Sequence, residues 1–269
     1  MAPRVSLVVA VYDQPRFLEL VLTSLAGQTL EDFEVVIADD GSGPAVRDVI
    51  EAHRSRLAQP IGHVWHPDEG FRKTVIVNRA VASSAGEILV FIDGDCILHR
   101  RFLERHWRRS RRGQLLSGRR VMLDAEITRT LTPADVASRR LESPVFWWAK
   151  SLPSSRRRGL YMPWMFGLNR AIRAGYSVLG SNFSLPREDF LAVNGYDERI
   201  LGRGLEDSNL DARLQKAGIR AAAISSEAIQ YHLFHRSGPM PHDAAAWRTF
   251  SHPDAAWTPF GMTRGRGSR

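Results

Sequence analysis

The sequence has a single cysteine, Cys96, so no internal disulfide can form and the small disulfide-stapled folds are excluded. It has no uninterrupted apolar run of about 18 residues, which excludes a conventional membrane-spanning helix. It is also poor in lysine, with only Lys73, Lys150 and Lys216, although 37 basic residues stand against 29 acidic ones. Nearly all positive charge is therefore arginine, which suits bidentate contacts to phosphate and carboxylate but could equally reflect a coding bias.

The composition is otherwise that of a globular protein. Of the 269 residues, 43% are apolar and 25% are charged, which excludes wholesale disorder, collagen-like repetition and a coiled coil. The net charge of +8 predicts a surface that attracts anions. The apolar run Val5–Val11 is too short for a signal peptide, and no small-residue cleavage site follows it. Together with the single thiol, these features predict a cytoplasmic protein.

Strand and helix patterns alternate over the first third of the chain. Short apolar runs bounded by polar turns predict four buried strands, at Val5–Val11, Phe33–Ala38, Ile61–Trp65 and Ile88–Ile92. Apolar residues at helical spacing lie between these strands, over 17–25, 46–50 and 75–82. This alternation is typical of right-handed βαβ units. The predicted fold class is therefore α/β, with a Rossmann-like, mostly parallel sheet flanked by helices.

The pattern loosens after residue 95. Strands are expected near 115–117, over 180–185 and near 221–224, and helices over 101–112, 187–193 and 206–217. The segment 143–176 interleaves aromatic residues with arginine. It is either a surface for a membrane or an extended acceptor, or core packing beneath an irregular loop. Residues 237–269 hold several Gly and Pro and have a basic end, so they predict a flexible tail.

Carboxylate side chains come just after three of the four predicted strands. Asp13, Asp39-Asp40 and Asp93-Gly94-Asp95 come after the first, second and fourth strands. Because the carboxyl ends of parallel strands share one edge, where ligands of such sheets bind, these five carboxylates are expected on one rim. Asp93 and Asp95 could share a hard cation such as Mg²⁺ or Mn²⁺, which would in turn bind a diphosphate. The alternative is ordinary turn chemistry.

Two further motifs could carry chemistry. Glu206-Asp207 begins a predicted helix after the glycine-containing loop 201–205. A carboxylate there could remove a proton from a bound hydroxyl, or could simply cap the helix. His232 and His235 follow the strand expected near 221–224, and neutral imidazole is a common ligand of transition ions. The alternative is that these histidines are structural or exposed.

Six motifs occur in the order seen in family 2 glycosyltransferases of the GT-A fold. They are Val5–Tyr12, Asp39-Asp40-Gly41-Ser42, Gly70-Phe71-Arg72 with Asn78-Arg79-Ala80, Asp93-Gly94-Asp95-Cys96, Gly180-Ser181-Asn182-Phe183 and Gly204-Leu205-Glu206-Asp207. The sequence most resembles the bacterial branch whose C-terminal half is similar to the galactosyltransferase and chondroitin-polymerase type. The resemblance covers residues 4–236. It implies one GT-A domain over 1–236, with a nucleotide-binding half at 1–98 and an acceptor-binding, catalytic half at 99–236, before a basic tail at 237–269.

The resemblance also implies an inverting, metal-dependent transfer of a hexose from a nucleoside diphosphate sugar, usually a UDP-sugar, to a hydroxyl group. The implied donor-binding residues are Val11, Tyr12, Asp39, Asp40, Arg72, Asn78, Asp93 and Gly94, and the implied donor-sugar and acceptor pocket is Gly180, Ser181 and Asn182. Mn²⁺ or Mg²⁺ is implied at Asp95, His232 and Asp93, with His235 as the alternative histidine. Asp207 is implied as the base, and Glu206 as a contact to the acceptor hydroxyl or the sugar.

The implied acceptor is a glycan or lipid-linked glycan of a surface polysaccharide, with no nucleic acid as partner. Peripheral association with the inner face of the cytoplasmic membrane would suit the segment 143–176. The sequence departs from the family in two places. Val11-Tyr12-Asp13 stands where relatives often show Pro and Asn, and the loop Gly202–Leu205 lacks the tryptophan that often stacks on the acceptor. These departures leave the nucleoside contacts and the acceptor open.

Two other functions compete with sugar transfer. A sugar-phosphate nucleotidyltransferase also uses an α/β sheet and Mg²⁺, but its glycine-rich, lysine-containing phosphate loop is missing, since Ala10–Pro15 has no glycine. A basic, non-catalytic module that binds nucleic acid or another anionic surface would explain the pI near 10.3 and the arginine-rich helix at 101–112. It would leave the acidic motifs at Asp93, Asp95 and Glu206-Asp207 without a role.

Overall fold

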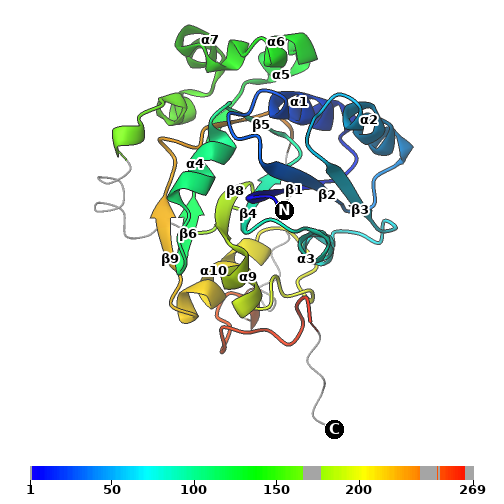
Figure 1. Ribbon diagram of the computed structural model, residues 1–269, viewed down its shortest axis with the longest axis vertical. Coiled ribbons are helices and arrows are strands. Elements are labelled where there is room, and N and C mark those ends of the chain that lie inside the picture. Colours follow the sequence, from blue (N-terminus) through cyan, green and yellow to red (C-terminus); the bar gives the residue numbers. More distant parts are fainter. Residues whose placement is uncertain (1, 166–176, 237–246, 248, 264–269) are drawn as a thin grey trace.

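The computed structural model describes residues 2–165, 177–236, 247 and 249–263, and its centre is a seven-stranded sheet (Figure 1). The four strands expected in the first third of the chain are present and pair in parallel, whereas β8 is antiparallel to its neighbours β4 and β6. The mostly parallel α/β sheet predicted from the sequence is therefore confirmed. Across the sheet the strands are β3 (Ile61–Trp65), β2 (Phe33–Asp39), β1 (Val5–Val11), β4 (Ile88–Asp93), β8 (Asn182–Pro186), β6 (Gln114–Ser117) and β9 (Arg220–Ala223).

Helices cover both faces of this sheet (Figure 1). Side chains alternate between the faces of a strand, so Val5 and Leu7 of β1 pack toward one set of helices and Val8 packs toward the other. Such burial on both faces explains why β1 is a continuous apolar run. The first set is α1 (Pro15–Leu25), α2 (Pro44–Arg54) and α4 (Phe102–Arg109), and the second is α3 (Lys73–Ser83), α9 (Arg187–Ala192) and α10 (Glu206–Lys216).

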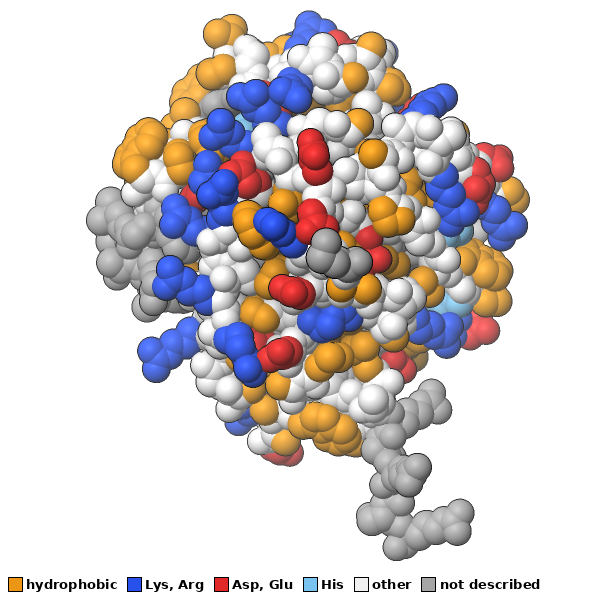
Figure 2. Space-filling view, in the orientation of Figure 1, with side chains coloured by type: hydrophobic (Ala, Val, Ile, Leu, Met, Phe, Trp, Pro, Cys, Tyr) orange, Lys and Arg blue, Asp and Glu red, His pale blue; other side chains and the backbone are white. Residues whose placement is uncertain are grey.

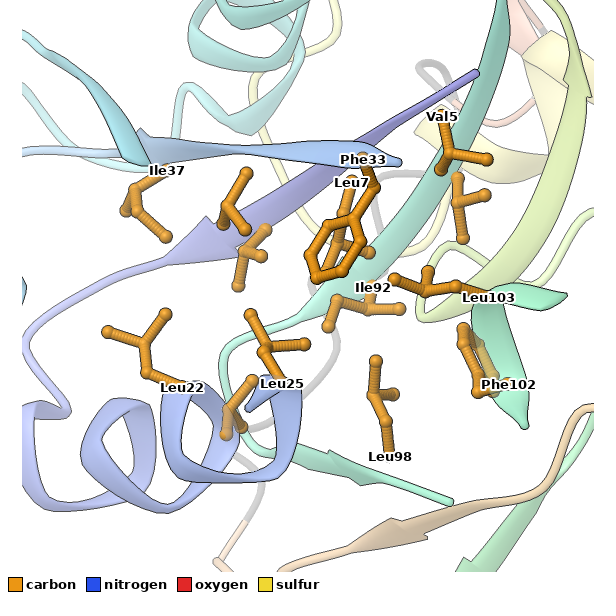
Figure 3. Packing of buried hydrophobic residues seen from close by; sticks show 14 of the residues in the cluster. Val5, Leu7, Leu22, Leu25, Phe33, Ile37, Ile92, Leu98, Phe102 and Leu103 are labelled. Carbon is orange, nitrogen blue, oxygen red and sulfur yellow. The ribbon is translucent and has the colours of Figure 1, made fainter. Parts of the chain in front are cut away.

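The core between the sheet and the first set of helices is built almost entirely from aliphatic side chains (Figure 3). Leu22 and Leu25 of α1 point toward Leu7 and Ile92 of the sheet, and Phe102 closes the same cluster. All of these side chains are at most 1% exposed. Burying a side chain of this kind contributes about 1.5–3 kcal/mol to folding, so this layer holds the sheet as a rigid platform.

A second, three-stranded sheet contains the chain around residue 232. It consists of β5 (Cys96–Leu98), β10 (Gln230–His232) and β7 (Arg120–Met122). In this sheet β10 pairs antiparallel with β5 and parallel with β7, so His232 lies opposite Cys96. The sequence predicts none of these short strands. The pairing of β10 with β5 nevertheless places His232 close to the end of β4.

Short helices between β7 and β8 form a lobe at the edge of the molecule, beside α1 (Figure 1). Within the segment 143–176, the part 166–176 lies outside the described residues. In the described part of the chain, no helix has the length and apolarity needed to cross a membrane. The elements of this lobe are α5 (Ala125–Thr130), α6 (Pro133–Ala137), η1 (Arg140–Glu142), α7 (Pro144–Lys150), η2 (Pro153–Gly159) and η3 (Pro163–Met165).

Part of the C-terminal segment packs against the body of the protein. Thr258 donates a hydrogen bond to the buried carboxylate of Asp197, at 2.9 Å. The side chain of Asn194 donates to the carbonyl oxygens of Thr258 and Thr263, at 2.7 and 2.8 Å. The expectation of a flexible tail over 237–269 is therefore wrong for residues 258–263, because buried polar groups of the body use this stretch as their partner. Residues 237–246, 248 and 264–269 lie outside the described part.

The sheet core predicts a large loss of stability on truncation of Phe183. Its ring is fully buried in β8 and stacks on Phe91 of β4, with ring centroids 4.4 Å apart. Phe183→Ala should lower the free energy of unfolding by about 3–5 kcal/mol, because it leaves a cavity between two paired strands. Urea denaturation measures this change. Leu191→Ala, at an exposed position of α9, is the control, and a loss below about 1 kcal/mol for Phe183→Ala would contradict the packing described here.

Candidate active site

A cleft of about 750 Å³ opens at the carboxyl ends of β1 and β4. Residues between Ala10 and Asp95 line it together with residues from 120–122, 179–181, 203–207 and 232–236. The structure thus brings together motifs that are up to about two hundred residues apart in sequence. The predicted site residues that line the cleft are Val11, Tyr12, Asp40, Asp93, Gly94, Asp95, Gly180, Ser181, Glu206, Asp207 and His232.

Two histidines, the buried His66 and the half-buried His63, hold the carboxylates at the end of β2. Asp40, which lines the cleft, contacts His66 Nε2 at 2.7 Å and accepts a hydrogen bond from the Arg72 backbone N–H at 3.0 Å. Asp39 lies behind the cleft lining and contacts His63 Nε2 at 2.8 Å. Burial acts to raise the pKa of Asp39, but its bonds to His63 and Ser42 outweigh burial and lower that pKa. The sequence gives no signal for these histidines, because they come from β3 and the loop that follows it.

At the same end of the cleft, Tyr12 is 54% exposed and donates a hydrogen bond from its hydroxyl to Asp68, at 3.0 Å. Asp68 and Gly70 also line the cleft. This contact joins the end of β1 to the loop before α3. Asp68 was not a predicted site residue, since the resemblance covers the motif two residues further on, Gly70-Phe71-Arg72.

Lys73 lies among the acidic groups at the centre of the cleft. Its Nζ donates to Asp93 Oδ1 at 2.7 Å. Burial would lower the pKa of Lys73, but the negative charges of Asp93, Asp207 and Glu206 outweigh this and raise it, so the ammonium stays charged. Asp93 therefore has a cationic partner of its own, supplied by the protein.

Asp95 forms a compact cluster with both candidate histidines. Its Oδ2 lies 3.3 Å from His232 Nε2 and 3.0 Å from His235 Nε2, and one ligand atom from each residue falls within 4.8 Å of the others. Burial opposes ionisation of Asp95, but its bonds to His232 and His235 outweigh burial and hold its pKa far below the usual range. The register of β10 against β5 produces this cluster, and Asp93 is not part of it.

The donor set of this cluster suits a transition ion. One carboxylate and two imidazoles match Mn²⁺ better than Mg²⁺, which prefers oxygen ligands alone. The other ring nitrogen of His232, Nδ1, is buried and has no hydrogen-bond partner among the described residues. The Nε2 atoms are the ring nitrogens that lie nearest Asp95 Oδ2, which places them to share a cation with it. The sequence left His232 and His235 as alternatives, whereas the structure places both beside Asp95.

Glu206 and Asp207 lie in the first turn of α10, facing the cleft. Asp207 accepts hydrogen bonds from the Gly180 backbone N–H at 2.7 Å and from the Tyr196 hydroxyl at 3.4 Å. Neither carboxylate caps the helix, because the N-cap residue is Leu205 and no side chain makes a capping bond. Burial is the largest influence on both groups, and it raises the pKa of Asp207 and the pKa of Glu206. A carboxylate with a raised pKa is a stronger base.

Position 180 requires a glycine because its backbone lies very close to the carboxylate of Asp207. A Cβ atom at this position would lie 2.6 Å from both carboxylate oxygens of Asp207, closer than van der Waals contact allows. The backbone N–H of residue 180 can reach the carboxylate only because no side chain intervenes. The glycine motif before β8 and the acidic motif of α10 are thus one structural unit.

Four predicted site residues do not line the cleft: Asp39, described above, and three more that have other partners. The Asn182 amide bonds to His106 and to the Arg119 carbonyl oxygen, beneath the sheet. The Asn78 side chain bonds to both backbone groups of Tyr196. The Arg72 guanidinium pairs with Glu69 at 2.7 Å. Asn182 and Asn78 therefore support the site from behind, and their expected ligand contacts have no counterpart in the cleft lining.

Comparison with solved structures supports the GT-A fold. A mannosyltransferase from Pyrobaculum calidifontis, solved with GDP-Man and Mn²⁺, aligns with a TM-score of 0.57 and 18% identity, over 92% of this chain and 60% of that one. S. aureus TarS residues 1–349, solved with UDP, align with a TM-score of 0.55 and 16% identity, over 85% and 60% of the two chains. The fold expected from the sequence motifs is confirmed.

Curated relatives are glycosyltransferases. Validoxylamine A glucosyltransferase of Streptomyces hygroscopicus subsp. jinggangensis is 29% identical over 243 residues, covering 81% of this chain and 52% of the relative. Chondroitin synthase of Escherichia coli is 28% identical over 91 residues, covering 34% of this chain and 13% of the relative. This chain thus spans about half the length of the first of these relatives and a smaller part of the second.

Family models cover nearly the whole region in which the motifs lie. The model described as N-terminal domain of galactosyltransferase matches residues 169–236, in agreement with the resemblance seen in the C-terminal half. The model described as Glycosyl transferase family 2 matches residues 6–175, which is more than half of the chain. The chain belongs to glycosyltransferase family 2.

Proposed function

We propose that this protein transfers a sugar, with inversion at the anomeric carbon, from a nucleoside diphosphate sugar to a hydroxyl group of an acceptor, and that the reaction depends on a divalent metal ion. One observation carries the proposal. A cluster suited to a transition ion, Asp95 with His232 and His235, shares a single cleft with Asp207, a carboxylate with the raised pKa of a base. Sugar transfer needs both groups within reach of one substrate.

The donor would enter with its nucleoside at the ends of β1 and β2. Val11, Tyr12 and Asp40 line that end of the cleft, and His66 holds the Asp40 carboxylate in place. We propose a UDP-sugar as donor. The family resemblance favours it. The solved neighbours were determined with UDP in one case and with GDP-Man in the other, so the identity of the nucleotide is the first point to test.

Asp95, His232 and His235 would hold Mn²⁺, with Mg²⁺ as the alternative. When bound, the ion supplies positive charge that stabilises the leaving diphosphate. Lys73 adds to this function from the protein itself. Its ammonium is held beside Asp93 in the same cleft, where it would attract the negative charge that develops on the diphosphate.

Asp207 would take the proton of the acceptor hydroxyl. As the hydroxyl oxygen bonds to the anomeric carbon, the bond from that carbon to the donor phosphate breaks, and the nucleoside diphosphate leaves with the electron pair. The proton goes to Asp207 Oδ, which Gly180 and Tyr196 hold in place through their hydrogen bonds. One displacement from the opposite face inverts the carbon. Glu206, bonded to the Gly204 backbone N–H, would contact the acceptor or sugar.

The two competing functions explain less of the structure. A basic binding module gives no reason for six carboxylates in one cleft, namely Asp40, Asp68, Asp93, Asp95, Glu206 and Asp207. Figure 2 shows that, on the face it presents, Lys and Arg side chains are scattered among acidic and apolar ones and do not form a continuous basic band. The turn after β1 also has no glycine-rich phosphate loop of the kind that nucleotidyltransferases use.

The first test is a screen of donors. Purified protein is incubated with UDP-, GDP-, ADP- and dTDP-sugars, with and without Mn²⁺, and release of the nucleoside diphosphate is measured. We expect release that requires Mn²⁺ and is at least about tenfold faster with one nucleotide class, which by the proposal is uridine. Mg²⁺ should support a slower reaction. Equal release with and without metal, after EDTA treatment, would contradict metal dependence.

We further propose that the protein is cytoplasmic, acts on a glycan or lipid-linked glycan in surface polysaccharide synthesis, and binds peripherally to the membrane. The described part of segment 143–176 supports the last point. Val145 and Trp164 are 82% and 75% exposed, and Leu152 and Leu160 are also exposed, beside the exposed Arg157 and Arg158. Exposed apolar side chains among arginines suit an anionic bilayer surface.

Vesicles test this association. The protein should sediment with vesicles containing one third phosphatidylglycerol and remain in solution with pure phosphatidylcholine. Replacing Val145 and Trp164 by Ser should reduce the bound fraction at least about threefold, because both apolar contacts with the bilayer are lost. Leu201→Ser, at another exposed apolar position outside this segment, is the control. Equal binding to both vesicle types would contradict an electrostatic membrane contact.

A further inference from the structure

The cleft is lined by arginines to which the proposed function gives no role. Besides Lys73, three arginines line it, namely Arg120 on β7, Arg203 in the loop before α10 and Arg236 after His235. All three belong to the part of the chain after residue 95, which also supplies Asp207, and none belongs to residues 10–95, which supply the nucleoside end of the cleft. This distribution points to a ligand other than the nucleotide.

Three of the six carboxylates of the cleft already have a lysine or histidine partner. Asp93 is paired with Lys73, Asp40 with His66, and Asp95 with two histidines. Within the described residues, no hydrogen bond or ion pair reaches the guanidinium group of Arg120, Arg203 or Arg236. Guanidinium groups that line a cleft without a bonded partner are available to bind an anionic group of a ligand.

Other groups are already placed to bind the donor diphosphate. The proposed metal-binding cluster at Asp95 and the Lys73 ammonium, whose pKa is raised by its acidic neighbours, both lie in the cleft. The arginines are additional to these groups.

The loop that carries Arg203 places this charge next to the base. Gly202 and Gly204 flank the arginine with φ angles of +149° and +95°, values that side-chain-bearing residues rarely adopt. The loop can therefore turn sharply, with Arg203 exposed, four residues before Asp207. An acceptor whose hydroxyl lies at Asp207 would have its neighbouring groups within reach of these arginines.

Resting on the function proposed above, we propose that Arg120, Arg203 and Arg236 form a subsite for an anionic group of the acceptor. The group is a phosphate or a carboxylate, both of which guanidinium binds in a bidentate manner. The acceptor is then an acidic or phosphate-bearing glycan, and a neutral sugar is a poor substitute for it.

The test separates the acceptor from the donor as the source of the anion. Protein saturated with Mn²⁺ and the nucleoside diphosphate selected by the donor screen is titrated calorimetrically with inorganic phosphate, with glucuronate and with glucose. We expect phosphate and glucuronate to bind this loaded protein at least about tenfold more tightly than glucose. Arg203→Gln and Arg236→Gln should each weaken anion binding about tenfold, the loss expected for one charge-assisted hydrogen bond.

Arg112→Gln is the matched control. It removes the same charge at an exposed ion pair with Glu188, outside the cleft, and should leave anion binding unchanged. The proposal is overturned if the nucleotide displaces the anion, since the arginines then serve the donor, or if Arg203→Gln and Arg236→Gln bind anions as the parent does. Titrating the same variants with anions in the absence of nucleotide shows whether the arginines bind anions independently of the donor. Binding of the nucleotide alone is measured separately and tests the proposed function.

Discussion

Asp207→Asn is expected to reduce sugar transfer by about 10²–10⁴-fold while donor binding stays within a few-fold of the parent. The substitution keeps the shape of the side chain and an oxygen that can accept the Gly180 hydrogen bond, but it removes the group that takes the proton. Transfer is followed as release of the nucleoside diphosphate, and donor binding by calorimetry in the presence of Mn²⁺. The two measurements separate a base from a residue that only binds substrate.

The pH dependence of release gives a second measurement on Asp207. Burial raises the pKa of this carboxyl, and the charge of Asp93 adds to the effect, while Lys73 opposes it. A base works only when deprotonated. Activity should therefore fall as the pH falls through the pKa of Asp207, at a pH above the range of an ordinary aspartate near about 3.9. The residual activity of Asp207→Asn should lack this acid limb.

Asp211→Asn is the control for Asp207. Asp211 lies one turn further along α10, and accepts hydrogen bonds from the Val178 backbone N–H and from Gln215, at 3.1 and 2.7 Å. It does not line the cleft. Its replacement should leave release within a few-fold of the parent. If Asp207→Asn released the nucleotide at the parent rate, Asp207 would not be the base.

Asp95→Ala is expected to abolish metal-dependent donor binding. The substitution removes the carboxylate that the Nε2 atoms of His232 and His235 both face, so the cluster loses its negative charge and one of its three ligands. We expect the affinity for Mn²⁺ to fall more than about 100-fold, and nucleotide binding to lose its dependence on Mn²⁺. Titration of Mn²⁺ followed by electron paramagnetic resonance measures the first effect directly, and calorimetry measures the second.

Asp189→Asn is the control for Asp95. Both carboxylates are 7% exposed, but Asp189 lies outside the cleft and accepts a hydrogen bond from the Gly113 backbone N–H, at 2.7 Å. A general loss of stability would appear in both variants, whereas a loss of Mn²⁺ affinity should appear only in Asp95→Ala. Parent-like Mn²⁺-dependent nucleotide binding by Asp95→Ala would remove the metal site from the proposal.

The sheet was predictable because its strands are encoded locally. A run such as Val5–Val11 is almost entirely apolar and packs against helices on both faces, and polar turns bound such runs, so the four parallel strands and their order along the chain follow from short segments. Asp93-Gly94-Asp95 and Glu206-Asp207 were recognisable for the same reason, since each follows or begins a predicted element. Their convergence in one cleft then follows from the parallel sheet.

The three-stranded sheet was not predictable in this way. β5, β7 and β10 are three residues each, too short to show a period, and they pair across more than one hundred residues of sequence. The packing of residues 258–263 against Asn194 and Asp197 is likewise non-local, and composition alone suggested a tail. Contacts of this kind depend on partners that a local pattern does not contain.

By itself, the sequence determined the fold class, the family and the set of acidic and histidine motifs from which the site is built. Only the tertiary structure decided how those side chains are used. It assigned Asp93 to Lys73, placed both His232 and His235 at Asp95, and turned Asn182 and Asn78 away from the cleft. The reason is physical, because the direction of a side chain at the end of a strand depends on register and on non-local partners, which neighbours in sequence do not specify.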